Sequence, residues 1–528
     1  MTALPDRQRS AGSWLFLGLL GVCFFVRGVQ IQCLYPPLEG PDEYQHIAYL
    51  VHLEEHGSLP LYGESTVPRS LYPHLLENPH SGLDWKQTRG IGALVYGQFY
   101  GQDPKPRGDP DIRLYQAQHP PLFYLATYRL FARLVDDYGF RPAVYATRAL
   151  NIAFASLGML LLLAPARRAF PDDDLFRPVA LAASLSPMFM IYVSRVANDP
   201  LSLLFAGVGV WLLMRFPATK SPLRTAALVG LVLGLGTLTK MTVLSLLPAS
   251  LAYLGYLALR AQLPWRTATY CGLTALGVYV LVVSPYLAFN YQHFGTVLSA
   301  QETIANTQAG YTLIDALREV RVEHAYTFFV RRSIRSNLWT SGWSFLRPNA
   351  LLTTLYMVTL LCAFGGLLFH GIRAARGRAW APPDAIVFCL LLVASTFLAA
   401  YAHALNSILA FGYIVTPTYY VMVAYPALFS CLLWAATGYG RAVARLLAFG
   451  LSAVFLVTEY HSLLGIAVPR WANTLDAGLA FDRLSLIHPA FPAPSYFAPL
   501  MVLSLLLVAV LVVQAAGFHR SKSSTPDA

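Results

Sequence analysis

Residues 13–60 read SWLFLGLLGVCFFVRGVQIQCLYPPLEGPDEYQHIAYLVHLEEHGSLP, and the two halves of this stretch differ in polarity. The first half, Ser13–Tyr35, is a largely apolar run long enough to cross the hydrocarbon core of a bilayer, which is about 30 Å thick. The second half presents two acids, Asp42 and Glu43, soon after that run ends. The stretch therefore predicts a membrane-spanning helix that is followed at once by an acidic segment at the membrane surface.

The composition of the whole chain agrees with a membrane protein. Of its 528 residues 56% are hydrophobic and 12% are charged, with a mean hydropathy of +0.50, whereas soluble proteins carry roughly 25% charged residues. We expect an all-α polytopic membrane protein with twelve spans, at residues 13–35, 143–166, 178–195, 200–215, 223–239, 241–259, 267–290, 351–371, 384–402, 417–436, 444–463 and 497–516. The net charge of +11 does not indicate nucleic-acid binding, because much of the excess lies in short connections between spans.

The basic residues of those short connections predict the orientation of the chain. Lys and Arg gather in alternate connections, which the positive-inside rule assigns to the cytoplasm. Both termini are then cytoplasmic, the first span is a retained signal anchor, and two long loops, residues 36–142 and 291–350, lie outside. This parity requires that Pro120–Val135 does not span. Arg129 and Arg133 stand one turn apart in that segment, which favours a helix lying in the membrane interface.

We therefore expect three regions in the chain. Residues 1–290 form a membrane module that includes the first long loop, residues 291–350 form the second long loop, and residues 351–528 form the C-terminal spans. Within the first long loop, Pro41 and Asp42 favour a helix start and Gly57 favours its end. Apolar residues recur along one face of this helix, namely Tyr44, Ile47, Ala48 and Val51. The pattern predicts a helix along the membrane with an acid at its start, and an N-cap is the alternative role for Asp42.

Five motifs follow one another along residues 30–300. They are PDEYQHIAYLVHLEEHGSLP (41–60), QHPPLFYL (118–125), VANDPLSLLF (196–205), GLVLGLGTLTK (230–240) and SPYLAFNYQHFG (284–295). In this order they resemble the motifs of the GT-C superfamily, membrane glycosyltransferases that use polyprenyl-phosphate sugars. The layout is most similar to the family 39-like branch, which contains lipid A aminoarabinose transferase and protein O-mannosyltransferase. The absence of a large C-terminal soluble region in the sequence argues against an oligosaccharyltransferase-like assignment.

The resemblance implies a GT-C-like bundle of about 12 transmembrane helices with interfacial helices in the first long loop. It implies transfer of a sugar, with inversion, from a polyprenyl-phosphate donor to a lipid, glycan or protein acceptor on the periplasmic or extracellular face of the plasma (inner) membrane. The leading acid of the first motif is the catalytic one in the family, so Asp42 is the expected general base. Glu43 is the alternative base, or a residue that orients Asp42.

Charged residues near span ends supply candidates for the donor phosphate. Lys240 ends an apolar span and is the first candidate for binding the donor phosphate. The alternative is that its side chain only snorkels to the membrane interface. His119 stands where the aminoarabinose transferase has Lys, and could donate a hydrogen bond instead. Tyr420 lies in a late segment where relatives carry R-Y-x-x-P, so an Arg and a Pro are missing. Other basic residues that could compensate are Arg195, Arg331, Arg332 and Arg335.

Asp199 has three possible roles. It could bind a divalent cation (Mg or Mn) together with Asp42, it could orient Lys240, or it could cap a helix that starts at Pro200. Aromatic residues that suit the interface or a sugar face are Tyr124, Trp339 and Trp343. The sequence is also compatible with two other functions. One is a lipid or glycan transporter or flippase, and the other is a non-catalytic subunit of a cell-envelope polysaccharide assembly system.

Overall fold

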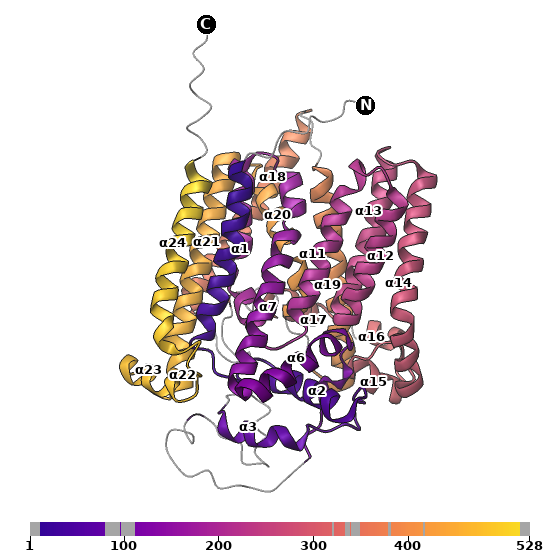
Figure 1. The fold of residues 1–528 in the computed structure, drawn as a ribbon. Coiled ribbons are helices and arrows are strands. Elements are labelled where there is room, and N and C mark those ends of the chain that lie inside the picture. The colour runs from indigo at the N-terminus through magenta and orange to yellow at the C-terminus, as the bar shows by residue number, and fades with distance from the viewer. Residues whose placement is uncertain are drawn as a thin grey trace.

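In a computed structural model of the 528-residue chain, the residues described are 11–79, 96, 111–318, 321–332, 338, 349–377, 382–414 and 418–517. These residues are mainly helical, and the β-bridge among them joins Thr66 to Arg113. Figure 1 shows long helices packed side by side in one bundle, with a layer of shorter helices across one end. We call this the loop end. At the opposite end of the bundle, α1 begins and α24 ends. The predicted all-α membrane fold is confirmed.

Ten helical segments of the described chain are long and apolar enough to cross a membrane. They contain α1 (Ala11–Gln32), α7 (Phe140–Leu162) with α8 (Ala164–Ala169), α11 (Asp199–Arg215), α12 (Pro222–Thr239), α13 (Leu246–Leu259), α14 (Trp265–Phe294), α18 (Ala350–Ala375), α19 (Asp384–Phe411), α21 (Arg441–Ser462) with α22 (Val468–Ala472), and α24 (Phe497–Ala516). Two further predicted spans take other forms. One is a pair bent by 49°, α9 (Asp173–Ser184) and α10 (Pro187–Val193). The other is a shorter apolar stretch made by η8 (Thr418–Ala424) and α20 (Tyr425–Ala436).

Small residues let α7 and α11 approach closely. A Cβ atom added to Gly158 would lie 2.6 Å from the carbonyl carbon of Leu203, and one added to Gly207 would lie 2.6 Å from the carbonyl oxygen of Gly158. Without a hydrophobic force between helices in lipid, such backbone contact is what favours helix association. The packing fixes α11, which begins at Asp199, against α7.

A buried ion pair between α1 and α21 lies at the bend between α9 and α10. Arg27 of α1 and Glu459 of α21 approach to 2.5 Å, with side chains 1% and 3% exposed. Arg27 also donates to the carbonyl oxygen of Ser184 at 2.9 Å, where α9 ends. The interruption before Pro187 leaves helix-end carbonyls without intrahelical partners, and the guanidinium supplies a donor there. This contact ties α1 and α21 to the segment that leads into the site.

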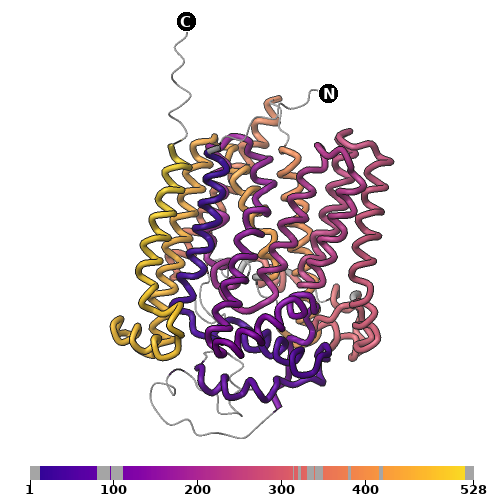
Figure 2. The backbone as a smooth tube through the Cα atoms, viewed as in Figure 1, coloured from indigo at the N-terminus to yellow at the C-terminus, as the bar shows by residue number. Residues whose placement is uncertain are grey.

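The first long loop forms most of the layer at the loop end (Figure 2). Its helices are α2 (Glu43–His56), η1 (Arg69–Leu71), α3 (Tyr72–Glu77), η3 (Tyr115–Gln118) and α6 (Leu122–Tyr138). As predicted, α2 ends at Gly57, which adopts the left-handed conformation at φ 63°. The segment around α6 forms a separate helix that is not among the ten spans, with Arg129 and Arg133 exposed.

Polar residues in the first part of α2 are buried as well as its apolar face, which the apolar pattern alone does not predict. Gln45 donates to the carbonyl oxygen of Arg113 at 3.0 Å, and His46 bonds the hydroxyl of Tyr124 at 2.7 Å. These partners come from chain segments beyond residue 110, so local periodicity does not reveal them. The described helices of the second long loop are α15 (Gln301–Gln308), α16 (Leu313–Arg318), α17 (Val322–Tyr326) and η6 (Thr327–Arg332). A short helix, α23 (Ala477–Ser485), follows α22.

Candidate functional site

Asp42 occupies an unusual backbone position directly before α2. Its φ and ψ are 59° and 8°, in the left-handed region that few residues other than Gly adopt but that Asp tolerates. Its side chain makes no cap hydrogen bond, so the N-cap alternative does not describe it. Instead, Oδ1 accepts a hydrogen bond from the hydroxyl of Tyr115 at 2.5 Å. The residue as a whole is partly exposed.

Burial opposes the ionisation of Asp42, and nearby cations and a hydrogen bond offset part of this effect. Burial raises the pKa of Asp42 above its ordinary value, while Arg195, the hydrogen bond from Tyr115 and Lys240 act to lower it. A carboxyl group with a raised pKa is a better proton acceptor than an ordinary aspartate, because basicity increases with pKa. Asp42 is therefore a partly exposed residue whose carboxylate is more basic than that of an ordinary aspartate and is close to Arg195 and Lys240.

Three charged residues, Arg195, Asp199 and Lys240, lie close to one another and act on Asp42. Asp199 pairs with Arg195 at 2.8 Å through one carboxylate oxygen, and with Lys240 through the other. All three side chains are at most 4% exposed. Arg195 also donates to the carbonyl oxygen of Pro41, the residue before Asp42. We call Asp42, Arg195, Asp199 and Lys240 the ionic cluster; their roles in a reaction stay a prediction.

Hydrogen bonds to α7 and α12 hold the segment that carries Arg195 and Asp199. Asn151 of α7 donates to the carbonyl oxygens of Arg195 at 2.7 Å and Ala197 at 3.1 Å. Asn198 donates to the carbonyl oxygen of Thr239 at 2.9 Å, next to Lys240. Asn198 is the N-cap of α11, and Asp199 lies in its first turn, so capping does not account for the Asp199 side chain.

Glu43 takes a different place from its neighbour. Its two carboxylate oxygens accept from Arg148 at 2.8 and 2.6 Å, and from the backbone N–H groups of Val196 and Leu38 at 2.7 and 2.9 Å. Glu43 and Arg148 are fully buried. A carboxylate with four donors and no access to solvent is an anchor that joins α2, α7 and the 194–199 segment. This geometry does not suit the predicted base or orienting role, because the partners all belong to the scaffold.

Two histidines with lowered pKa values lie near the charged residues Arg195 and Lys240. His119 and His46 stack with ring centroids 5.8 Å apart. Burial, followed by the charge of Lys240, lowers the pKa of His119 to about 3, and burial also lowers the pKa of His46. His119 can therefore offer a hydrogen bond but no positive charge at neutral pH. Tyr124, expected at a substrate or interface surface, is instead fully buried, stacked on Tyr49 at 3.7 Å, and orients His46.

The other predicted site residues belong to the second long loop. Arg331 and Arg332 lie in η6, where the backbone alone is described. The remaining three lie outside the described residues: Arg335, Trp339 and Trp343. Their assignment to the donor site stays a prediction.

Three residues of the site region were not singled out as site residues from the sequence. Arg148 is a lone arginine within an apolar span, which is itself an indication of a buried partner. Tyr115 gives no such indication. Tyr420, noted only as a departure from the family pattern, places its ring 5.6 Å from the Nζ atom of Lys240. This contact brings η8 to the ionic cluster.

The described donor atoms do not suit a divalent cation between Asp42 and Asp199. Both oxygens of Asp199 are bonded to cationic side chains. No group of three His, Cys, Asp or Glu residues in the described part of the chain is arranged to hold a metal ion. A metal requirement stays a prediction.

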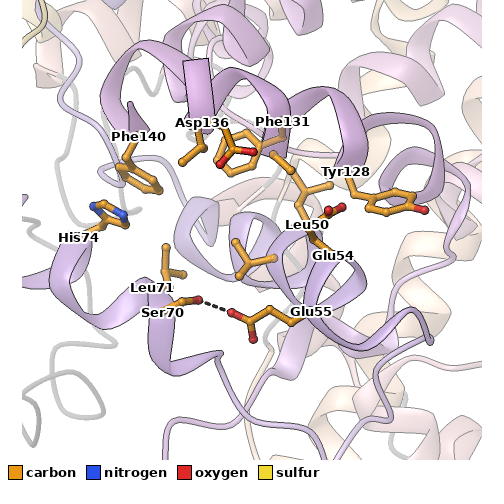
Figure 3. A pocket seen from close by; sticks show the side chains of 13 residues that line it. Leu50, Glu54, Glu55, Ser70, Leu71, His74, Tyr128, Phe131, Asp136 and Phe140 are labelled. Carbon is orange, nitrogen blue, oxygen red and sulfur yellow. Dashed lines mark hydrogen bonds between the residues drawn. The ribbon is translucent and has the colours of Figure 1, made fainter. Parts of the chain in front are cut away.

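A cavity of about 190 Å³ lies away from the ionic cluster, between α2, η1, α3, α6 and the start of α7 (Figure 3). Leu50, Leu71 and Phe131 contribute apolar walls, while Glu55 at its edge accepts a hydrogen bond from Ser70. Its lining shares no residue with the ionic cluster.

Comparison with known proteins gives one family match. Residues 118–289 match the sequence model of the dolichyl-phosphate-mannose-protein mannosyltransferase family. The chain is therefore similar to membrane glycosyltransferases of the GT-C superfamily, which confirms the resemblance that the motifs predicted. The matched segment contains His119, Arg195, Asp199 and Lys240. A search of curated proteins gives no significant match.

Among solved structures, the chain is similar to ArnT from Cupriavidus metallidurans bound to undecaprenyl phosphate, with a TM-score of 0.45 and 16% identity over 96% of this chain and 75% of that chain. It is also similar to the oligosaccharyltransferase of Archaeoglobus fulgidus in the apo form, with a TM-score of 0.43 and 12% identity. That alignment covers 92% of this chain and 59% of the archaeal protein.

Proposed function

We propose that the protein is a membrane glycosyltransferase that moves a sugar from a polyprenyl-phosphate donor to a hydroxyl-bearing acceptor at the loop end of the bundle, with Asp42 as the general base. The observation that carries the proposal is the ionic cluster, in which a partly exposed aspartate with a raised pKa lies near two buried cations. The family match over residues 118–289 supports the same class of reaction.

In this proposal the reaction is a single displacement at the anomeric carbon. Asp42 accepts the proton of the acceptor hydroxyl, whose oxygen forms the new glycosidic bond. The bond from the anomeric carbon to the phosphate oxygen breaks, and its electron pair leaves with the polyprenyl phosphate. Attack opposite the leaving group inverts the anomeric configuration. The proton transfer needs the acceptor oxygen within about 3 Å of the carboxylate.

Negative charge grows on the phosphate as this bond breaks. Fixed cations near that position stabilise the transition state more than the ground state, because the charge they meet increases. Lys240 and Arg195 are such cations, and Asp199 holds both in place before substrate arrives. His119 is neutral and adds a hydrogen bond to the phosphate. The loop end faces the periplasm or the exterior in this proposal, because the connections at the other end carry most of the Lys and Arg.

The proposal is tested by sugar transfer in a purified system. The full chain is reconstituted in liposomes and supplied with a panel of radiolabelled polyprenyl-phosphate sugars and an envelope-lipid acceptor mixture. Release of polyprenyl phosphate together with a labelled product supports the proposal. Movement of intact donor across the bilayer, with no glycosidic bond broken, would favour the flippase alternative.

A further inference from the structure

A second buried acidic group lies next to the ionic cluster and takes no part in the mechanism above. Glu302, in the first turn of α15, has a side chain that is 3% exposed, and one of its oxygens lies 3.3 Å from Nε2 of His403 on α19. Although burial acts to raise it, the contact with His403 holds the pKa of Glu302 below its ordinary value. The carboxylate is thus ionised, and its contact fixes the position of the imidazole ring of His403.

The pair stands at a junction of both long loops. The backbone N–H of Gln301 donates to the side-chain oxygen of Gln118 at 2.7 Å, directly before His119. Asn306, one turn further along α15, donates to the carbonyl oxygen of Asn406 on α19 at 3.0 Å. Glu302 and His403 therefore lie on a segment that is fixed to the site by hydrogen bonds on both sides.

Tyr420 connects this pair to the ionic cluster. The ring of His403 meets the ring of Tyr420 edge to face, with centroids 5.0 Å apart, and Lys240 lies 5.6 Å from the same ring. The charge of His403 also acts on His119, whose pKa it helps to lower. The ring of Tyr420 therefore lies between the imidazole of His403 and Lys240 in this chain of contacts.

The balance of charges in the site indicates a role for the Glu302–His403 pair in binding an anionic donor. Asp42, Asp199 and Glu302 contribute three carboxylates, whereas the ionic cluster contributes two basic side chains, Arg195 and Lys240. An anionic donor entering a site with excess negative charge would be repelled. A hydrogen bond donated by the imidazole of His403 to the phosphate would offset part of this repulsion.

We propose that His403, held by Glu302, is a second phosphate-binding residue of the donor site, acting beside Lys240 on the phosphate of the polyprenyl-phosphate sugar. The inference rests on the proposed function for the identity of its ligand. Glu302 is a positioning residue, because it acts on the phosphate through His403. The pair would supply a phosphate-binding group where Tyr420 stands in place of the R-Y-x-x-P pattern.

The test measures binding and turnover separately in the reconstituted full chain. Titration with polyprenyl phosphate gives Kd, and donor saturation gives KM and kcat. We expect His403→Gln to raise Kd and KM about tenfold or more, as for loss of a charge-assisted hydrogen bond, with kcat changed less than about threefold. Glu302→Gln should move Kd in the same direction, and His403→Arg should restore most of the affinity. His293→Gln, at the exposed end of α14, is the matched control and should change neither constant.

Each outcome decides one question. An unchanged Kd and KM in His403→Gln overturns the inference, as does a loss that His403→Arg fails to rescue together with a lower melting temperature, since that marks a structural role. Unphosphorylated polyprenol and phosphatidylglycerol are titrated in parallel, and equally tight binding of phosphatidylglycerol would reassign the site to a bilayer headgroup. If the wild type binds polyprenyl phosphate through His403 but transfers no sugar from any donor, the proposed function fails and the phosphate site stands. If it does not bind polyprenyl phosphate, the inference fails.

Discussion

Replacing Asp42 with Asn removes the proposed base while leaving the surrounding structure in place. Asparagine has the same shape, and its side-chain oxygen can still accept the hydrogen bond from Tyr115. The backbone at φ 59° and ψ 8° suits Asn as well as Asp, since both tolerate the left-handed region. No cap hydrogen bond is lost. The unfolding free energy should therefore change by less than about 1 kcal/mol.

The effect on catalysis should be much larger. General acid–base catalysis contributes about 10²- to 10⁴-fold in rate, which corresponds to a barrier increase of about 2.7–5.4 kcal/mol. We expect kcat of Asp42→Asn to fall by this factor, with the Kd for polyprenyl phosphate changed far less, because Lys240 and Arg195 remain paired with Asp199.

The pH dependence of kcat/KM supplies a second readout. A base must be deprotonated to act, so activity falls as the pH drops through the pKa of Asp42. Burial raises that pKa, so the acidic limb should lie above the ordinary value of 3.8. Tyr115→Phe removes a hydrogen bond that lowers this pKa, and should shift the limb to higher pH. The limb should be absent from the residual activity of Asp42→Asn.

The assay is donor-dependent sugar transfer by the reconstituted chain across a pH series, with thermal unfolding of each variant as the folding control. Full activity of a folded Asp42→Asn protein would remove Asp42 as the base. An acidic limb that stays in place in Tyr115→Phe would show that another group controls it.

Three further predictions concern the charged residues around this base. Lys240→Ala should raise the donor KM at least tenfold in saturation assays while Lys240→Arg retains most donor affinity, and an unchanged donor dependence in the alanine variant would move the phosphate site elsewhere. Glu43→Gln should lower stability in thermal unfolding by about 3–5 kcal/mol, because it leaves a buried guanidinium without its carboxylate, and an unaltered melting temperature would refute the anchor role. Arg27→Met and Glu459→Leu should each destabilise the protein, whereas the double variant should recover most of the loss, and strictly additive losses would show that the two side chains are not coupled.

Much of the fold follows from the sequence because a bilayer demands long apolar helices. Ten of the twelve predicted spans fall on described helices that are long and apolar enough to cross a membrane, and the other two fall on the bent pair α9 and α10 and on the shorter stretch of η8 and α20. Gly57 ends α2, as its conformational freedom suggests. The bend between α9 and α10 was not predicted, although Pro187 stands at it. Its stability depends on Arg27, which comes from the first helix and which local sequence does not connect to the bend.

The candidate site is predicted less completely, since its partners are distant in the chain. The motifs placed Asp42, Asp199 and Lys240 at span ends, and these residues do converge. The sequence could not separate Asp42 from Glu43, because the difference lies in a left-handed backbone and in Arg148, 105 residues further along. No pattern in the sequence pairs α15 with α19.

The most direct measurement of the central claim is the release of polyprenyl phosphate from a panel of polyprenyl-phosphate sugars by the purified, reconstituted chain, followed by mass spectrometry. The account predicts that at least one donor loses its sugar to an acceptor in the wild type, and that Asp42→Asn binds the same donor but leaves it intact. Intact donors throughout the panel with the wild type, or equal sugar release by both proteins, would contradict it.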